Sequence, residues 1–423
     1  MTKIIERNIY QNLKNHLKEK EITVLIGPRQ TGKTTLILEL YKELKKESPD
    51  KVFYFNLDRL KDLSFFSSQE EVIKFISSRI QKGKKNKIYL FVDEFQRIEN
   101  AGRFFKGIYD VGLPVKLALT GSSSLDIKDK MQESLAGRKK VFRLFTLSFG
   151  EFLRYKDKTL FRLINQEKIS NFDKNAILDF LKEFIIWGGY PAVVTENNPN
   201  KKREMLEEIY NSYVEKDAIF FLKIKKPLVF RKLLQLLVFQ IGQIANTNEL
   251  SSSLNIENRT TEYYLDVLQE TFIVKAVPPF FSNPRKELVK ASKFYLLDNG
   301  LMNLAKDSFK SFNDRVDKGA LLENFVAGEL SKDDVSRKLR YWRTLHGAEV
   351  DFIIERPSGP MPIEVKTQIK KSALGKNFVN FLSDYKTQDA FFVNLSQKNK
   401  FKFKNTDIHF IYPFQLQKIL KKI

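Results

Sequence analysis

The sequence contains no cysteine, and its three histidines, His16, His346 and His409, lie far apart in the chain. A disulfide framework and a thiolate metal site are therefore excluded, and a zinc site built from the histidines would need a coincidence of the fold. No apolar run approaches the roughly 20 residues that a membrane-spanning helix needs, and the amino-terminal segment has no apolar signal core. We therefore expect a cytoplasmic protein without a membrane partner.

Acidic residues are scarce relative to basic ones. The 423 residues include 73 Lys and Arg against 51 Asp and Glu, which gives a formal net charge of +22. This charge favours a polyanion such as nucleic acid as a partner, although lysines that keep a phenylalanine-rich protein in solution would give the same composition. The hydrophobic content of 42% is enough for sizeable cores. The length predicts about two to four domains.

The segment Gly27 to Thr34, GPRQTGKT, fits the phosphate-binding pattern G-x-x-x-x-G-K-[ST]. The apolar run before it is typical of a buried strand, and the run after it is typical of a helix. Glycines let backbone amides turn toward an anion, and the helix dipole adds positive potential there. We predict that Lys33 reaches the β- and γ-phosphates of ATP and that the Thr34 hydroxyl binds Mg²⁺. The predicted nucleotide-binding set is Gly27, Pro28, Arg29, Gln30, Thr31, Gly32, Lys33, Thr34 and Thr35.

A second apolar run, KIYLFVDEF from Lys87 to Phe95, ends in two carboxylates about 60 residues after the first motif. Asp93 at the end of this predicted strand is suited to hold Mg²⁺ through water. Glu94 is suited to polarise the water that attacks the γ-phosphate. Gln96 is either a further residue that orients this water or a polar loop residue.

A third apolar run, VKLALTGSSS, ends in hydroxyl groups. In P-loop enzymes with a strand between the two motif strands, this position carries a polar residue that senses the γ-phosphate. Ser122 or Ser123 fits that role, and both also fit a helix cap. Arg138 is predicted either to contact phosphate in its own or a neighbouring subunit or to be structural. Strands that alternate with helices predict a parallel sheet with ligands at the carboxyl ends of its strands.

Together, GPRQTGKTT, FVDEFQRI, LTGSSS and LAGR…LSFGEF resemble the AAA-like P-loop ATPases of archaea and bacteria that carry an additional C-terminal domain. The resemblance extends over essentially the whole chain. It implies an α/β fold, with a parallel-sheet ATPase core over residues 1–150 and a helical lid over residues 151–227. It also implies an enzyme that hydrolyses ATP with Mg²⁺.

Residues 228–300 show three helical patterns and then two strand patterns around a turn, which predicts a winged helix-turn-helix. The third helix, residues 257–270, carries four acidic residues and only Arg259 to offset them, so phosphates would repel it. Docking of a protein, or simple packing, is therefore an alternative to DNA contact. The basic residues of the turn that favour DNA contact are Arg285, Lys286, Lys290 and Lys293.

Residues 301–423 contain a helix with Glu323, a strand with Asp351 and a strand with Glu364 and Lys366. Asp351, followed after 12 residues by E-x-K, resembles the core of PD-(D/E)XK nucleases. This resemblance implies that Asp351 and Glu364 bind Mg²⁺, with Glu323 as an auxiliary ligand. It also implies that Lys366 stabilises charge on the scissile phosphate or positions water. Glu349, two residues before Asp351, is suited to face the same site. The alternative is a solvated sheet edge with ordinary ion pairs.

Two interpretations of the whole chain remain open. In the first, ATP binding and hydrolysis change how the winged-helix and nuclease-like parts engage DNA. In the second, the chain is a signal-transducing ATPase switch that binds a protein partner and keeps an inactive nuclease-like scaffold. The net charge favours the first, and the acidic third helix favours the second. A small-molecule kinase is a weaker third reading, because only the P-loop supports it. The oligomeric state is left open.

Overall fold

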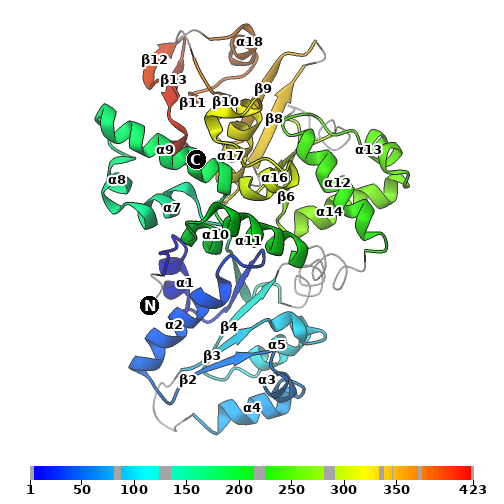
Figure 1. Cartoon of the computed structure of the whole chain (residues 1–423). Helices are drawn as coiled ribbons and strands as arrows, with labels where there is room; N and C mark the ends of the chain where they lie inside the picture. The colour runs from blue at the N-terminus through cyan, green and yellow to red at the C-terminus, as the bar shows by residue number, and fades with distance from the viewer. Residues whose placement is uncertain are drawn as a thin grey trace. The chain divides into compact units, whose positions relative to one another are not determined.

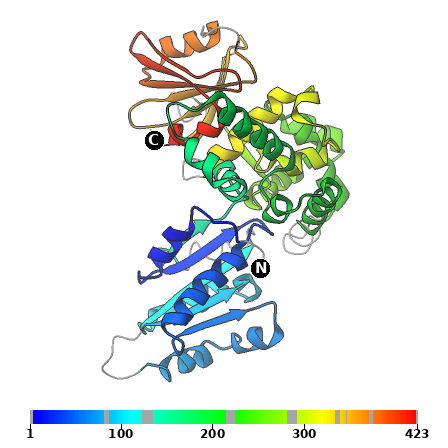
Figure 2. The same cartoon turned by 60° about the vertical axis from the view of Figure 1, so that its left-hand side comes forward.

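The computed structural model describes residues 4–80, 87–122, 135–213, 224–280, 291–332, 338–344, 346–369 and 374–420. The chain divides into two compact units (Figures 1 and 2). The first extends from the amino terminus to Phe145 and includes the short segment 270–272, and almost all later residues belong to the second. Within the described ranges, no helix is both long enough and apolar enough to cross a bilayer.

The first unit is built on a parallel sheet of five strands in the order β2-β3-β4-β1-β5. This confirms the predicted parallel sheet, and it places β4 between the strands that carry the two nucleotide motifs. The strands are β1 (Ile22–Gly27), β2 (Val52–Asn56), β3 (Ile88–Asp93), β4 (Val115–Ser122) and β5 (Lys139–Arg143). The helices are α1 (Tyr10–His16), α2 (Lys33–Glu47), α3 (Leu60–Phe65), α4 (Gln69–Ser77) and α5 (Ala101–Asp110), with a short 3-10 turn η1 (Phe95–Arg97).

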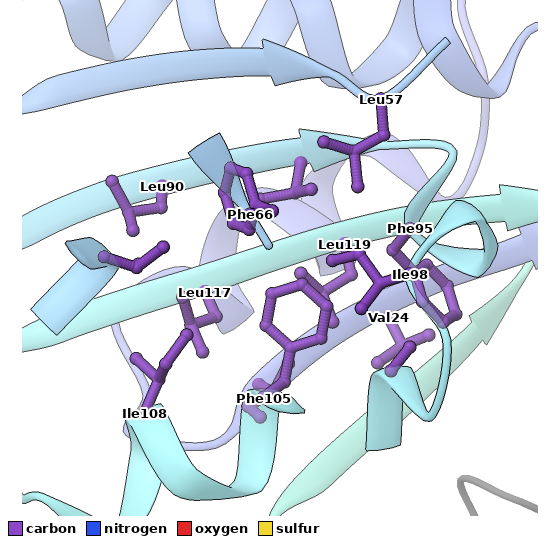
Figure 3. Close-up of a cluster of buried hydrophobic side chains, with 14 of the residues drawn as sticks. Val24, Leu57, Phe66, Leu90, Phe95, Ile98, Phe105, Ile108, Leu117 and Leu119 are labelled. Atoms are coloured by element: carbon purple, nitrogen blue, oxygen red, sulfur yellow. The ribbon is translucent and has the colours of Figure 1, made fainter. Parts of the chain in front are cut away.

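Successive residues of the central strands point into two different cores. Val24 and Leu90 belong to the core that packs against α3, α4 and α5, whereas their neighbours Leu25 and Phe91 belong to the core under α1 and α2. Figure 3 shows the first of these cores, in which strand side chains meet rings from the helices. Because both faces of the sheet are covered, its central strands are mainly apolar, and several polar residues occur where these strands end.

The second unit begins with helices that carry the chain away from Phe145. These are α7 (Phe149–Lys156), α8 (Lys158–Leu163), α9 (Asn171–Trp187), α10 (Pro191–Thr195) and α11 (Pro199–Ser212). The entry to α7 is held by the end of α17 (Lys318–Ser331). Glu329 accepts a hydrogen bond from the Phe149 amide at 3.1 Å, and Lys332 donates to the Leu147 carbonyl oxygen at 2.7 Å.

The middle of the second unit has the order of elements that the sequence predicts for residues 228–300. It consists of α12 (Pro227–Phe239), α13 (Thr247–Leu254), α14 (Asn258–Glu270) and the antiparallel strands β6 (Val274–Val277) and β7 (Lys293–Leu296). The turn between the strands, with Arg285, Lys286 and Lys290, lies outside the described residues. The prediction that Lys293 contacts DNA is wrong, because this residue is fully buried.

After α16 (Asn299–Ala305) and α17, the chain forms a six-stranded sheet in the order β12-β13-β11-β10-β9-β8. Strands β8, β9 and β10 are antiparallel neighbours, whereas β10, β11 and β13 run parallel. The strands are β8 (Leu339–Arg343), β9 (Glu349–Ile354), β10 (Met361–Lys366), β11 (Asp389–Asn394), β12 (Asn399–Phe403) and β13 (Thr406–Ile411). Helix α18 (Lys376–Asp384) packs Phe378 and Phe381 on one face of the sheet, and α19 (Gln417–Leu420) follows β13.

Lys116 on β4 is a charged residue buried within the first unit. Its ammonium donates to the Glu21 carbonyl oxygen and lies 3.5 Å from Nδ1 of His16. Burial lowers the pKa of Lys116 from 10.5 to about 7. Below this value the folded protein must bury a charged ammonium. Above it the unfolded chain binds more protons than the folded one, so stability rises with pH until the unfolded lysine also loses its proton.

We expect Lys116→Met to raise the free energy of unfolding most at or below about pH 7. The gain should shrink as the pH approaches about 10, because the cost that the substitution removes fades over that window. Chemical denaturation at several pH values measures this difference, with the exposed Lys42 on α2 changed to Met as the control. A gain that does not vary with pH would contradict the assignment.

Candidate nucleotide site and a buried carboxylate cluster

The loop between β1 and α2 has a tightly curled backbone. Gln30 and Gly32 have positive φ angles of 58° and 93°, and Gly32 is the cap residue of α2. A side chain at Gly27 would overlap the carbonyl oxygen of Leu144, so only glycine fits there. Consecutive turns of this kind, directly before a helix, direct backbone amides toward one point, which suits an anion.

Lys33 lies at the centre of this loop. Its side chain is buried, and Nζ donates to the carbonyl oxygens of Gly27 at 2.9 Å and Pro28 at 2.8 Å. The Thr31 hydroxyl donates to the same Pro28 oxygen at 2.9 Å. Arg7 binds the loop from outside, since one guanidinium nitrogen donates to the Thr31 carbonyl oxygen at 2.8 Å. A second nitrogen of Arg7 donates to the carbonyl oxygen of Phe145, the last residue of this part of the unit, at 2.7 Å.

The remaining predicted residues of the loop differ in exposure. Thr34, the second residue of α2, is half-buried, whereas Thr35 is exposed. Arg29 is half-buried and Gln30 is exposed. The closed position of Gly27, the curl of the loop and the buried ammonium of Lys33 together fit a triphosphate with its metal ion.

Asp93 and Glu94 lie where β3 ends. The buried Asp93 carboxylate accepts hydrogen bonds from the Tyr54 hydroxyl at 3.0 Å and from the Thr120 hydroxyl. Glu94 has a left-handed backbone with φ of 57°. Burial raises the pKa of Glu94, while the nearby positive charge of Lys33 opposes this shift. The carboxylates and the Lys33 ammonium therefore act on one another at the same edge of the sheet.

Ser122 completes this edge from the strand between the two motifs. It pairs in register with Gly27 on β1. The Gln96 side-chain amide donates to the Ser122 hydroxyl at 3.1 Å and also to the Glu94 carboxylate. The structure thus brings together the predicted residues Lys33, Glu94 and Ser122, and it adds Gln96 as the link between the last two. Ser123 lies outside the described residues.

Arg138 lies at the end of the sheet where β1 starts, opposite the end where the phosphate loop follows β1. Its carbonyl oxygen accepts from the Ile22 amide, at the start of β1, whereas the phosphate loop follows the end of that strand, about 16 Å away. Its guanidinium is paired with Asp110 at the end of α5, at 2.7 Å. This position speaks against contact with phosphate in its own chain. Contact across a subunit boundary stays a prediction.

A second group of acidic side chains lies within the second unit, on β9, β10 and α17. Asp351 accepts a hydrogen bond from the Val365 amide at 2.7 Å. One carboxylate oxygen of Glu364 lies 2.7 Å from Nζ of Lys366, while the other is buried and makes no hydrogen bond within the described residues. A buried carboxylate oxygen without a donor is costly, and a divalent cation would satisfy it.

Crowding and burial change the acidity of this cluster. Burial, reinforced by the charge of Asp351, raises the pKa of Glu323 to about 7 and that of Glu364 to about 8. Burial also raises the pKa of Asp351. Without a cation, Glu323 and Glu364 therefore hold protons during part of the time near neutral pH. The donor set is all oxygen, which suits Mg²⁺ or Mn²⁺.

Two residues of this cluster were missed by the sequence reasoning, and both come from β7. Lys293 forms an ion pair with Glu349, and its Nζ lies 4.0 Å from Glu323. The Tyr295 hydroxyl donates to the same Glu323 oxygen at 2.6 Å. The only local signal was the spacing, since residues two apart on a strand share a face.

The three predicted metal ligands of the cluster are not all close together. Among the described residues, the ligand atoms of Glu323, Asp351 and Glu364 do not all lie within 4.8 Å of one another. Asp351 and Glu364 are linked through Val365, whereas Glu323 is engaged by Tyr295.

The group of this size that the described residues do contain is Asp389, Asp407 and His409. Nε2 of His409 lies 3.0 Å from Asp389. Arg356 lies 3.6 Å from Asp389, and Lys400 lies 3.1 Å from Asp407. Because these cations already accompany both carboxylates, the group is better explained as an ion-pair network than as a metal site.

Three segments of the chain match known protein families. Residues 19–153 match a family described as "AAA domain". Residues 178–311 match a "Domain of unknown function (DUF8612)", and residues 318–416 match a "Domain of unknown function (DUF4143)". The last two descriptions name no activity.

Relatives are found in archaea and bacteria. An uncharacterized protein of Methanocaldococcus jannaschii is 28% identical over 362 residues, which cover 83% of this chain and 75% of that protein. An uncharacterized protein of Haemophilus influenzae is 23% identical over 380 residues, which cover 87% and 88%. A solved Walker-type ATPase of Pyrococcus abyssi is 15% identical with a TM-score of 0.45, over 72% of this chain and 96% of that one. The family match, the parallel sheet and the glycine-rich loop together show that residues 19–153 are similar to an AAA domain.

Proposed function

We propose that the chain binds ATP with Mg²⁺ at the loop Gly27–Thr34, hydrolyses it, and uses the nucleotide state to control how the second unit engages nucleic acid. The observation that carries the ATPase proposal is the gathering of Lys33, Asp93, Glu94 and Ser122 at one edge of the parallel sheet. Asp93 and Ser122 end the strands β3 and β4, Glu94 follows β3, and Lys33 begins α2 directly after the loop.

Each of these residues has a distinct task in hydrolysis. The buried ammonium of Lys33 would exchange its bonds to loop carbonyls for bonds to the β- and γ-phosphates. Thr34 and Asp93 would hold Mg²⁺, which neutralises negative charge on the phosphates. Glu94 would accept a proton from the attacking water as the γ-phosphoryl group leaves ADP. Burial raises the pKa of Glu94, which makes it a stronger base than an exposed carboxylate.

Gln96 would couple the base to the γ-phosphate. Its amide joins the Glu94 carboxylate to the Ser122 hydroxyl, so a phosphate oxygen that binds Ser122 would also change the position of Glu94. Among the described residues, the side-chain carbonyl oxygen of Gln96 is buried and has no hydrogen-bond partner, which fits a bound water. Gln96 is therefore proposed as a positioning residue for hydrolysis.

The second part of the proposal concerns nucleic acid. The orphan oxygen of Glu364, beside Asp351 and Lys366, supports a site for one divalent cation that acts on a phosphodiester, in keeping with the resemblance to PD-(D/E)XK nucleases. Asp351 and Glu364 would bind the cation, and Lys366 would stabilise charge on the phosphate. The net charge of +22 supports a polyanionic partner.

A second candidate function is an ATPase switch that binds a protein partner or further copies of the chain and keeps an inactive nuclease-like scaffold. The observation in its favour is α14, the third helix of the middle module. The segment from Glu257 to Glu270 contains four acidic residues and a single basic residue, Arg259, a charge pattern that repels DNA. Arg138, at the far edge of the ATPase sheet, is proposed to act only toward a neighbouring copy.

We expect Lys33→Ala to lower ATP turnover by roughly 100-fold or more. The substitution removes the buried ammonium that would stabilise negative charge on the transferred phosphoryl group. Release of phosphate from the full-length protein measures it. Lys42→Ala, which removes an exposed lysine from the same helix, should retain wild-type turnover. Unchanged turnover in Lys33→Ala would refute the assignment of the phosphate loop.

We expect Gln96→Ala to lower kcat more than it changes KM for ATP. The hydrogen bond from Gln96 lowers the pKa of Glu94 against the effect of burial, so its removal raises that pKa further. Because Glu94 must be deprotonated to act as a base, the acidic limb of the profile of kcat against pH should move to higher pH. Arg97→Ala, at the exposed neighbouring residue, is the control. An unmoved limb would leave Gln96 with a structural role alone.

We expect nucleic acid cleavage that depends on Mg²⁺ or Mn²⁺ and is lost in Asp351→Ala but kept in Asp384→Ala, which changes an exposed acid on α18. Single-stranded, duplex and branched DNA are compared, and DNA affinity is measured at several salt concentrations. Affinity should fall steeply with salt, because phosphate contacts release counterions. No cleavage of any substrate, together with affinity that ignores salt, would favour the switch that binds a protein.

A further inference from the structure

The carboxylate cluster of the second unit contains a buried ammonium group in addition to Lys366. Lys293, the first residue of β7, is fully buried. Its Nζ pairs with Glu349, lies 4.0 Å from Glu323 and stands 5.3 Å from the centre of the Tyr341 ring. A lysine so far from water is retained only where fixed negative charge compensates its lost hydration.

The cluster divides into two halves. In one half, Glu323 and Glu349 are satisfied by Lys293, by the Tyr295 hydroxyl at 2.6 Å and by Arg343 at 3.5 Å. Every group in this half is held by a partner from the chain itself. This half therefore leaves little unpaired negative charge for a metal ion to neutralise.

The other half is incomplete. Asp351 accepts one bond from a backbone amide, and Glu364 pairs with the half-exposed Lys366 through one oxygen only. The second Glu364 oxygen is buried and has no hydrogen-bond partner in the described structure. In this half, two carboxylates face the single ammonium of Lys366. In the other half, two carboxylates face the two cations Lys293 and Arg343. The half with Asp351 and Glu364 is therefore the one with negative charge left over for a metal ion.

We propose that the Lys293 ammonium takes the place of a second divalent cation, so that the cluster binds a single ion on Asp351 and Glu364. Glu323 then serves Lys293 and Tyr295 and does not bind the metal, which differs from the role that the sequence resemblance implies. Glu323 is engaged by the Tyr295 hydroxyl and lies near the Lys293 ammonium, whereas Asp351 accepts its bond from the amide next to Glu364, which supports this division. The inference rests on the metal site of the proposed function.

A fixed ammonium has consequences that a second metal ion would not have. It carries one positive charge, cannot exchange with solvent ions and cannot bind a substrate oxygen from its buried position. Metal sites with two ions hold both the attacking and the leaving oxygen of a phosphodiester. Here a single ion would contact the phosphate. Lys293 would compensate the negative charge of Glu323 and Glu349 without contacting the phosphate itself.

The test counts Mn²⁺ ions bound to the full-length, nucleotide-free protein by electron paramagnetic resonance, in an Asp93→Asn background that removes a carboxylate from the nucleotide site. We expect one ion per chain, lost in Asp351→Asn and in Glu364→Gln. Glu323→Gln should keep both the count and the affinity. Two ions in the unchanged cluster, or loss of binding in Glu323→Gln, would overturn the proposal.

Lys293→Met provides the reverse test. It leaves Glu323 without its cation and Glu349 with Arg343 alone. A second Mn²⁺ should therefore bind, and Mn²⁺ should raise the melting temperature more than in the parent protein. A count that stays at one in the folded variant contradicts the proposal. If the variant does not fold, Lys293→Met combined with Glu349→Gln removes the ion pair, and Glu323→Gln remains decisive. Absence of any ion at Asp351 would refute the metal site itself, whereas a wrong count would refute only the role of Lys293.

Discussion

The curled backbone between Gly27 and Lys33 is the constraint on which the nucleotide site depends. Gly27 has no space for a side chain, and Gly32 adopts a conformation that other residues avoid, so the loop closes around the Lys33 ammonium. The parallel sheet then supplies the rest, because its strands all end at the same edge. The strand order β3-β4-β1 places Asp93, Glu94 and Ser122 at the same end of the sheet as the loop that bears Lys33.

The second unit solves a different problem, which is the burial of like charges. Burial raises the pKa of Glu323, Asp351 and Glu364, and the charge of Asp351 raises the pKa of the two glutamates further. The three carboxyls would resist folding if all were ionised and unpaired. The chain supplies part of the compensation itself through β7, whose residues Lys293 and Tyr295 reach the cluster from the middle module. The middle module and the six-stranded sheet are therefore joined chemically as well as by packing.

Most residues of the candidate nucleotide site could be predicted from the sequence, because the patterns that indicate them are formed by residues close together in the chain. A strand pattern, a glycine-rich loop and a helix pattern adjoin one another at Gly27–Thr34, and apolar runs end in polar residues at Asp93 and Ser122. The bonds from Tyr54 and Thr120 to Asp93 could not be predicted, since they depend on the register of neighbouring strands.

Only part of the carboxylate cluster could be predicted from the sequence. Asp351, Glu364 and Lys366 have a recognisable spacing on adjacent strands, but Lys293 lies 56 residues from its partner Glu349. No local periodicity encodes a contact of that range, and a lysine beside a basic turn is more often exposed. Strand β12 was overlooked for a related reason, because its NKFKF pattern keeps lysines in solvent and resembles a loop.

Arg7 gives the phosphate loop a mechanical link that is independent of catalysis. One end of its guanidinium holds the Thr31 carbonyl and the other holds that of Phe145, directly before the second unit begins at Thr146. Within the second unit, the Lys332 ammonium donates a hydrogen bond to the Leu147 carbonyl oxygen. Lys332 caps α17, the helix that bears Glu323. A loop that shifts on taking up a triphosphate cannot keep both bonds of Arg7 unless the chain at Phe145 shifts with it. Arg7 therefore couples the conformation of the phosphate loop to the backbone position of Phe145 within the first unit.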